Sequence, residues 1–254
     1  MSGMPVLVSL TAYGAELARR VGQAELARIA AVAGADGVEY RAELQRGGAA
    51  ELDEQAGVAR EHGLAVVWSS PDGLWSGAGA LDETALERAF ATAATLGATR
   101  VKMSLGAYSQ GGAVDAILPW LRRDGIELVV ENDQTAAAGT VPPLQDFFGR
   151  IAGHGERVEM TFDMGNWCWT GEDVLAAARA LGDQVGYIHC KGVQRLPAKW
   201  VAVPLEDSSG PWRSVLRHLP AGVPRAIEFP LQGEDLVQVT RDQLALLRSA
   251  EQGA

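Results

Sequence analysis

The strongest constraint on the fold is a series of short apolar segments that each end in a chemically active side chain. Four of them fill the second half of the chain: residues 126–132 with Glu131, 157–163 with Asp163, 185–195 with His189, and 225–229 with Glu228. Their spacing is close to the roughly 30 residues of one β/α unit in a barrel of about 250 residues. These segments are therefore predicted to be four successive strands of a parallel barrel.

The first half of the chain continues the same alternation of strands and helices. Strands are expected at 4–10, 37–41, 64–69 and 99–105, and helices at 23–33, 49–62, 81–97, 113–123, 144–151, 172–181, 212–218 and 234–248. Eight alternations without a break in composition predict an α/β fold, a single-domain (β/α)8 TIM barrel spanning residues 1–254. The rival is an open doubly wound sheet. It is disfavoured because LTAYGAEL, and no glycine-rich phosphate fingerprint, follows the first strand.

Charge and composition exclude two classes of partner. The formal net charge is −10, so no basic field attracts a nucleic acid backbone. The chain also lacks an apolar run of about 18 residues, which a membrane span would need. Its two cysteines, without a leader-like start, indicate reduced thiols and a cytoplasmic location. A small molecule is the expected partner, and a homo-oligomer stays open.

If the last four strands are neighbours, their side chains converge at one side of the barrel mouth. The set contains three carboxylates, Glu131, Asp163 and Glu228, and the imidazole of His189. Such a cluster repels itself unless a divalent cation lies within it. Three oxygen ligands and one nitrogen suit Mn²⁺, Mg²⁺ or Co²⁺, and Mn²⁺ is the expected ion.

The phrases VVEND, TFDMGNW, YIHCKG and AIEFPLQGEDL resemble the xylose-isomerase-like barrels, the sugar phosphate isomerase/epimerase superfamily, over nearly the whole chain. Its ketose 3-epimerases and hydroxypyruvate isomerase-like members are the nearest in pattern. The resemblance implies that Glu131 and Glu228 both bind metal and exchange protons, and that Asp163 and His189 are ligands only. The wording ENDQT and PRAIEFPLQGEDL is also similar to epimerases that accompany bacterial 2-ketogluconate utilisation.

Candidate substrate contacts come from the resemblance and from the other strand ends. Arg195 matches a substrate-binding arginine of the epimerases, whereas Asn166 stands where those enzymes usually have a histidine. Lys191 gives the phrase H-x-K, which is similar to the inosose and dehydroshikimate dehydratases and suits an anionic or carbonyl-bearing substrate. The remaining candidates are Glu39, Trp68 and Lys102. Four of these candidates have a structural alternative. Glu39 could form a rim salt bridge, Trp68 could pack in the core, Lys191 could be solvated, and Arg195 could brace the long loop at 192–211 through Glu206 or Asp207.

These features lead to one main hypothesis and two alternatives. The main hypothesis is a metal-dependent isomerase or epimerase of a sugar or sugar acid, in which the metal stabilises an enediolate and two glutamates move the proton. The first alternative is a dehydratase of a keto-cyclitol or of dehydroshikimate, motivated by Lys191. The second is a metal-bound sugar-binding protein without turnover. A nuclease of the same superfamily is disfavoured, because only His189 of the four histidines is placed to bind metal.

Overall fold

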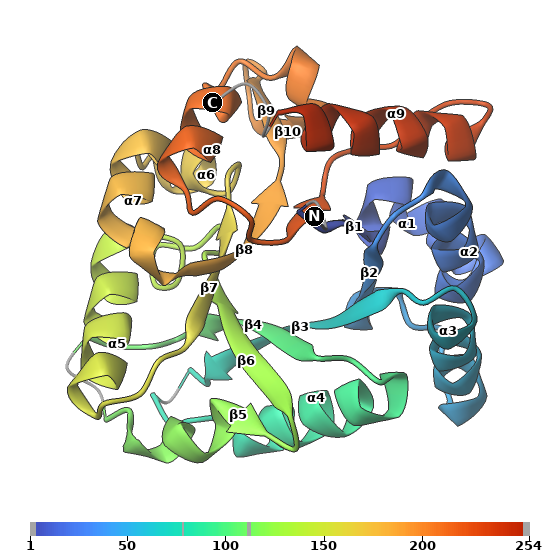
Figure 1. The fold of residues 1–254 in the computed structure, drawn as a ribbon. Helices are drawn as coiled ribbons and strands as arrows, with labels where there is room; N and C mark the ends of the chain where they lie inside the picture. The colour runs from blue at the N-terminus through green and yellow to red at the C-terminus, as the bar shows by residue number, and fades with distance from the viewer. Residues whose placement is uncertain (1–3, 78, 111–112, 251–254) are drawn as a thin grey trace.

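Eight parallel strands close into a barrel that the helices surround, in the computed structural model of the protein (Figure 1). The structure describes residues 4–77, 79–110 and 113–250. The barrel strands are β1 (Val6–Ser9), β2 (Gly37–Arg41), β3 (Ala65–Trp75), β4 (Arg100–Gly106), β6 (Ile126–Glu131), β7 (Glu159–Asp163), β8 (Val185–Cys190) and β11 (Arg225–Ile227). Pairing of β1 with β11 and of β4 with β6 completes the ring, which confirms the predicted TIM barrel.

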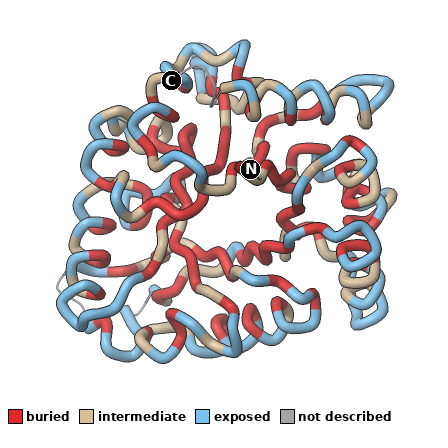
Figure 2. The backbone as a smooth tube through the Cα atoms, viewed as in Figure 1, coloured by how far each residue is buried: buried red, intermediate tan, exposed pale blue. Residues whose placement is uncertain are grey.

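The helices turn one face toward the barrel and the other toward solvent, as the burial colours show (Figure 2). They are α1 (Ala15–Val21), α2 (Gln23–Ala33), α3 (Ala49–Glu61), α4 (Glu83–Leu96), α5 (Val141–Gly153), α6 (Trp167–Thr170), α7 (Val174–Leu181), α8 (Trp212–His218) and α9 (Leu236–Ser249). Asp82 caps the start of α4, since its side chain accepts from the Ala85 backbone N–H at 2.9 Å. Within the described residues, none of these helices has the length and apolar character that crossing a bilayer requires.

The predicted helix at 113–123 is wrong. The chain forms a short 3-10 helix, η3 (Asp115–Trp120), and then β5 (Arg122–Arg123), which pairs antiparallel with β6. Pro119 lies inside this segment, and proline removes a backbone donor and clashes with the preceding turn of an α-helix. Asp124 and Gly125 both adopt positive φ, which reverses the chain into β6.

Two further segments differ from the sequence prediction. Strand β3 does not stop at Pro71 but continues to Trp75 through a register shift between Ser69 and Gly73, where an irregular pairing tolerates a proline. Between the seventh barrel strand and α8, where no regular structure was expected, the chain forms a hairpin of β9 (Gly192–Arg195) and β10 (Trp200–Val203). The two cysteines, Cys168 and Cys190, are free thiols.

The interior of the barrel changes character along its axis. At one level it is apolar, with Leu7, Val67, Tyr187 and Ala226 in a small buried cluster. Toward the carboxyl ends of the strands, charged side chains fill the interior: Glu39 and His189 are fully buried, and Lys102 is 1% exposed. Because burying charge is costly unless it is paired, this layer requires a dense network of contacts.

Candidate active site and metal centre

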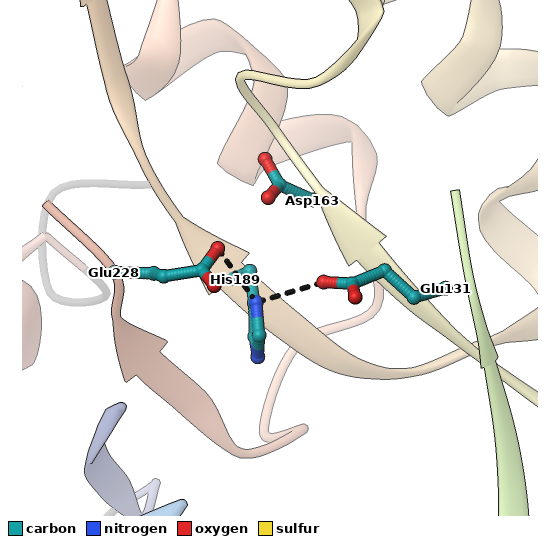
Figure 3. A group of neighbouring side chains, drawn as sticks. All are labelled: Glu131, Asp163, His189 and Glu228. Atoms are coloured by element: carbon teal, nitrogen blue, oxygen red, sulfur yellow. Dashed lines mark hydrogen bonds and ion pairs between the residues drawn. The ribbon is translucent and has the colours of Figure 1, made fainter. Parts of the chain in front are cut away.

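The four predicted metal ligands come together at the carboxyl ends of β6, β7, β8 and β11 (Figure 3). One donor atom from each of Glu131, Asp163, His189 and Glu228 lies within 4.8 Å of the others. The Nδ1 atom of His189 is 2.9 Å from Glu131 Oε1 and 2.9 Å from Glu228 Oε2. The convergence that the strand spacing predicted is therefore confirmed.

Each glutamate of the cluster has one oxygen held by a cation and the other directed at His189. Glu228 Oε1 accepts a hydrogen bond from Arg41 at 2.9 Å, while Glu228 Oε2 faces the imidazole. Glu131 Oε2 accepts from the ammonium group of Lys102, while Glu131 Oε1 faces the same imidazole nitrogen. The cations thereby fix the direction of the two carboxylates.

The two oxygens of Asp163 also have separate partners. Its Oδ1 atom accepts backbone N–H bonds from Gly165 at 2.8 Å and Asn166 at 3.0 Å. Its Oδ2 atom is 2.6 Å from Lys191 Nζ, which also lies 2.9 Å from Glu228 Oε2. The backbone of Asp163 is itself fixed, since the Asn132 side chain bonds both its N–H and its C=O.

A layer of charge lies beneath the cluster and centres on Glu39. Its Oε2 atom is 2.7 Å from His189 Nε2. Its Oε1 atom accepts from Arg41 at 2.8 Å and lies 3.6 Å from Lys102 Nζ. We call Glu39, Arg41 and Lys102 the floor of the site. The floor touches three of the four candidate ligands.

Burial and charge shift the pKa values of these groups in opposite directions. Burial opposes ionisation of Glu39, but the positive charge of His189 and Lys102 outweighs it and lowers the pKa of Glu39. Burial also opposes the charged form of His189 and so lowers its pKa. The carboxylates of Glu228 and Glu39 outweigh this effect and raise the pKa of His189 well above its ordinary value. Burial raises the pKa of Asp163 to about 7 against the opposing effect of Lys191. Each buried carboxylate of this network therefore lies beside at least one positive charge.

The donor set fits a divalent cation. Each of the three carboxylates directs one oxygen to a common centre, and His189 supplies one nitrogen there. Oxygen-rich sets of this kind suit hard cations such as Mg²⁺ and Mn²⁺ better than ions that prefer thiolates. Glu131, Asp163, His189 and Glu228 are the residues that would hold the ion.

A cavity of about 350 Å³ adjoins the cluster. Its lining includes Glu228 and Lys191, together with Tyr13 just after the first barrel strand, Ala202 of the hairpin, and Gln232. Gln232 was not among the residues predicted from the sequence. The only available signal was that Gln232 follows the eighth strand within a few residues.

Of the predicted substrate contacts, one lines the cavity, three are buried beside the cluster, and two lie away from it. Lys191 lines the cavity. Glu39, Lys102 and Asn166 are buried within the protein, and the Asn166 side chain bonds the Asn132 C=O and accepts from Lys191. Arg41 belongs to the floor with Glu39, and because it follows Glu39 by two residues on β2, strand alternation places both side chains on one face.

Trp68 and Arg195 lie away from the cluster. Trp68 belongs to the core packed between the barrel and its helices, whereas its neighbour Val67 faces the barrel interior. Arg195 is exposed on β9 with its guanidinium 5.3 Å from the centre of the Trp200 ring. Its register partner is Trp200, two residues from the cavity-lining Ala202 on the same strand. Substrate binding by Arg195 stays a prediction.

Comparison with known proteins agrees with the geometry. A family model described as "Xylose isomerase-like TIM barrel" matches residues 27–249. No curated protein matches the chain.

Several solved structures share the fold at low sequence identity. D-allulose 3-epimerase from Methylomonas sp., in complex with D-allulose, superposes with a TM-score of 0.72 at 12% identity, covering 98% of each chain. The probable 3-DHS dehydratase of petrobactin synthesis from Bacillus anthracis gives 0.71 at 13% identity, over 96% of this chain and 98% of that one. The 3-keto-D-glucoside 4-epimerase of E. coli gives 0.67 at 16% identity, over 97% and 99%. At these identities the likeness establishes the fold alone.

Proposed function

This chain belongs to the xylose isomerase-like TIM barrel family, and from that premise we propose that it is a divalent-metal-dependent isomerase or epimerase of a sugar or sugar acid. One observation carries the proposal: Glu131 and Glu228 approach the His189 nitrogen from opposite sides, each at 2.9 Å (Figure 3). A substrate between two carboxylates has a base on one side and an acid on the other. That arrangement suits removal and return of a proton at one carbon.

The residues of the chain divide the work of such a reaction. Glu131 or Glu228 removes the proton next to the carbonyl, and the opposite carboxyl group returns one. If the two act on opposite faces of the carbon, the configuration inverts; if one group moves the proton between neighbouring carbons, an aldose and a ketose interconvert. A divalent ion at the cluster, Mn²⁺ in our proposal, would supply Lewis-acid stabilisation of the negative charge that develops beside the carbonyl.

The two glutamates have different cationic partners, and the difference bears on their roles. Lys102 binds Glu131 from a position that is 1% exposed. Glu228 faces Arg41 on one side and Lys191 on the other, each at 2.9 Å, and it lines the cavity. Because Lys191 also lines the cavity, its ammonium group can turn to an anionic substrate group. We therefore favour a sugar acid, such as a 2-keto sugar acid, over a neutral sugar.

Proton exchange with solvent tests this proposal. The purified protein, loaded with Mn²⁺ and then exchanged into Mg²⁺ for NMR, is incubated in D₂O with ketoses, 2-keto sugar acids and their phosphates. The expected result is deuterium at the carbon next to the carbonyl of one compound, even where equilibrium hides net conversion. Binding of a compound without any deuterium uptake would instead support a sugar-binding protein without turnover.

A dehydratase is the second candidate, and Lys191 is the observation that favours it. Its ammonium group is 2.6 Å from Asp163 and 2.9 Å from Glu228, so an acid lies beside a candidate base. Such a pair could remove a proton and protonate a leaving hydroxyl group. Ultraviolet absorbance of a conjugated enone, formed from dehydroshikimate or a keto-cyclitol, would establish this reaction over the isomerase.

A further inference from the structure

Glu39 is fully buried, so its carboxylate is not placed to meet a substrate. Its two oxygens have different partners. Oε2 is 2.7 Å from His189 Nε2, while Oε1 faces Arg41 at 2.8 Å and Lys102 at 3.6 Å. We infer that Glu39 is a positioning residue that holds His189 in the tautomer able to bind the metal. This inference rests on the metal centre of the proposed function.

The geometry of His189 explains why a partner is needed. Its Nδ1 atom faces Glu131 and Glu228, and its Nε2 atom faces Glu39. A neutral imidazole carries one proton, and a nitrogen that carries it cannot bind a metal ion. With a cation bound at Nδ1 the imidazole is neutral and its one proton must lie on Nε2, where the Glu39 carboxylate, which only accepts hydrogen bonds, stabilises it.

Packing alone does not make this selection. The Tyr187 ring meets the His189 ring edge to face with centroids 5.1 Å apart, which restrains the plane of the imidazole. Contact with an aromatic ring does not decide which nitrogen carries the proton. The hydrogen bond to Glu39 does.

Arg41 and Lys102 extend the role of Glu39 to the two glutamates of the cluster. Arg41 joins Glu39 to Glu228, and Lys102 joins Glu39 to Glu131. Both cations are donors only, so they require an oxygen at the Oε1 position. This requirement makes the substitution Glu39→Gln informative.

Glutamine offers one oxygen and one NH₂ group. With its oxygen held by Arg41 and Lys102, its NH₂ group would face His189 Nε2, which must then accept. The proton moves to Nδ1 and blocks the atom that faces the cluster. Loss of such a partner typically lowers metal affinity about 10- to 100-fold.

The experiment measures Mn²⁺ affinity by titration calorimetry for the wild type, Glu39→Gln and Glu43→Gln. Glu43 is the matched control, because it binds the same Arg41 guanidinium at 2.9 Å but is exposed and is not a partner of His189. We expect weaker Mn²⁺ binding for Glu39→Gln only, with an unchanged circular dichroism spectrum. Equal affinity in the wild type and Glu39→Gln would overturn the inference.

A second measurement reports the tautomer directly. Long-range ¹H–¹⁵N spectra are recorded at a Zn²⁺ concentration that saturates the wild type but not Glu39→Gln. They should show a protonated Nε2 for His189 in the wild type and a protonated Nδ1 in the metal-free fraction of the variant. The same tautomer in both would refute the role. If Glu39→Gln does not fold, Glu39→Asp keeps the charge but withdraws it from Nε2, and its Mn²⁺ affinity should still fall.

These outcomes separate the inference from the proposed function. Mn²⁺ binding that depends on Glu39, without deuterium exchange in any sugar, supports the positioning role and contradicts the isomerase. Failure of the wild type to bind Mn²⁺ contradicts both.

Discussion

Two regions border the site, and each contains an arginine in a different environment: Arg41 is largely buried and Arg195 is exposed. In the floor, Arg41 has a side chain 14% exposed and makes ion pairs with Glu39 and Glu228. In the β9–β10 hairpin, Arg195 is exposed and lies over Trp200, and within the described residues no ion pair to a carboxylate is found for it. The difference shows that burial decides what a charged side chain can do.

The physical reason is the cost of desolvation. A buried charge that loses its partner is strongly unfavourable, so the floor holds its side chains in fixed positions. An exposed charge is screened by water and gains little from any one partner, so it remains able to meet a ligand. The floor is therefore suited to hold the candidate metal ligands in place, whereas the Arg195 charge of the hairpin stays in solvent.

The largest expected effect is on catalysis at the buried centre. Glu228→Gln should lower deuterium incorporation about 10²- to 10⁴-fold, because it removes a group that moves the proton. NMR of the substrate in D₂O measures the rate. The matched control is Glu206→Gln, an exposed glutamate beyond the hairpin, which should leave the rate unchanged. Persistence of exchange in both Glu131→Gln and Glu228→Gln would contradict the mechanism.

The next effect is on stability. Lys102→Met removes the buried cation between Glu39 and Glu131 and should lower the free energy of unfolding by about 3 to 5 kcal/mol, since it takes one of the positive charges that compensate these buried carboxylates. Lys199→Met, in the exposed turn of the hairpin, should change it by less than about 0.5 kcal/mol. Urea denaturation in the presence of EDTA gives both values. Similar losses in the two variants would show that burial does not separate the regions.

Metal binding should stabilise the floor more than the hairpin. Mn²⁺ at 100 times its Kd adds about 2.7 kcal/mol to the free energy of unfolding, and EDTA removes this gain. Hydrogen exchange should slow at the amides of β2 and β8 on loading with diamagnetic Zn²⁺, with little change in β9 and β10. If the amides of β9 and β10 slowed as much as those of β2 and β8, metal binding would not stabilise the floor selectively.

The smallest effect is expected at Arg195. Because this side chain is exposed, Arg195→Ala should weaken binding of an acidic sugar by about 0.2 to 1 kcal/mol, which raises its KM roughly 1.4- to 5-fold. The KM for the neutral analogue should not change. Steady-state kinetics on both substrates makes the comparison. An equal rise for the two sugars would assign Arg195 to the support of the hairpin through Trp200 instead.

Much of the fold and the four candidate ligands could be predicted because they depend on local patterns. Apolar segments at regular spacing predicted the strands, and parallel strands in a barrel bring their carboxyl ends to one rim. That rule alone placed Glu131, Asp163, His189 and Glu228 together. Segment 113–123 was mistaken for a helix because its apolar residues follow helical spacing, and Pro119 with the turn at Asp124 overrode that pattern.

The pairing of the buried charges could not be predicted in the same way. Strand alternation separates two faces, but which face is inside depends on the register with neighbouring strands, and this decided that Val67, not Trp68, faces the interior. The hydrogen bonds of His189 to Glu39 and of Arg41 to Glu228 join residues 150 and 187 positions apart. The sequence by itself determined which strand ends carry chemistry. Only the closed barrel decided which charges meet, because burial within it forces each of them to find a partner.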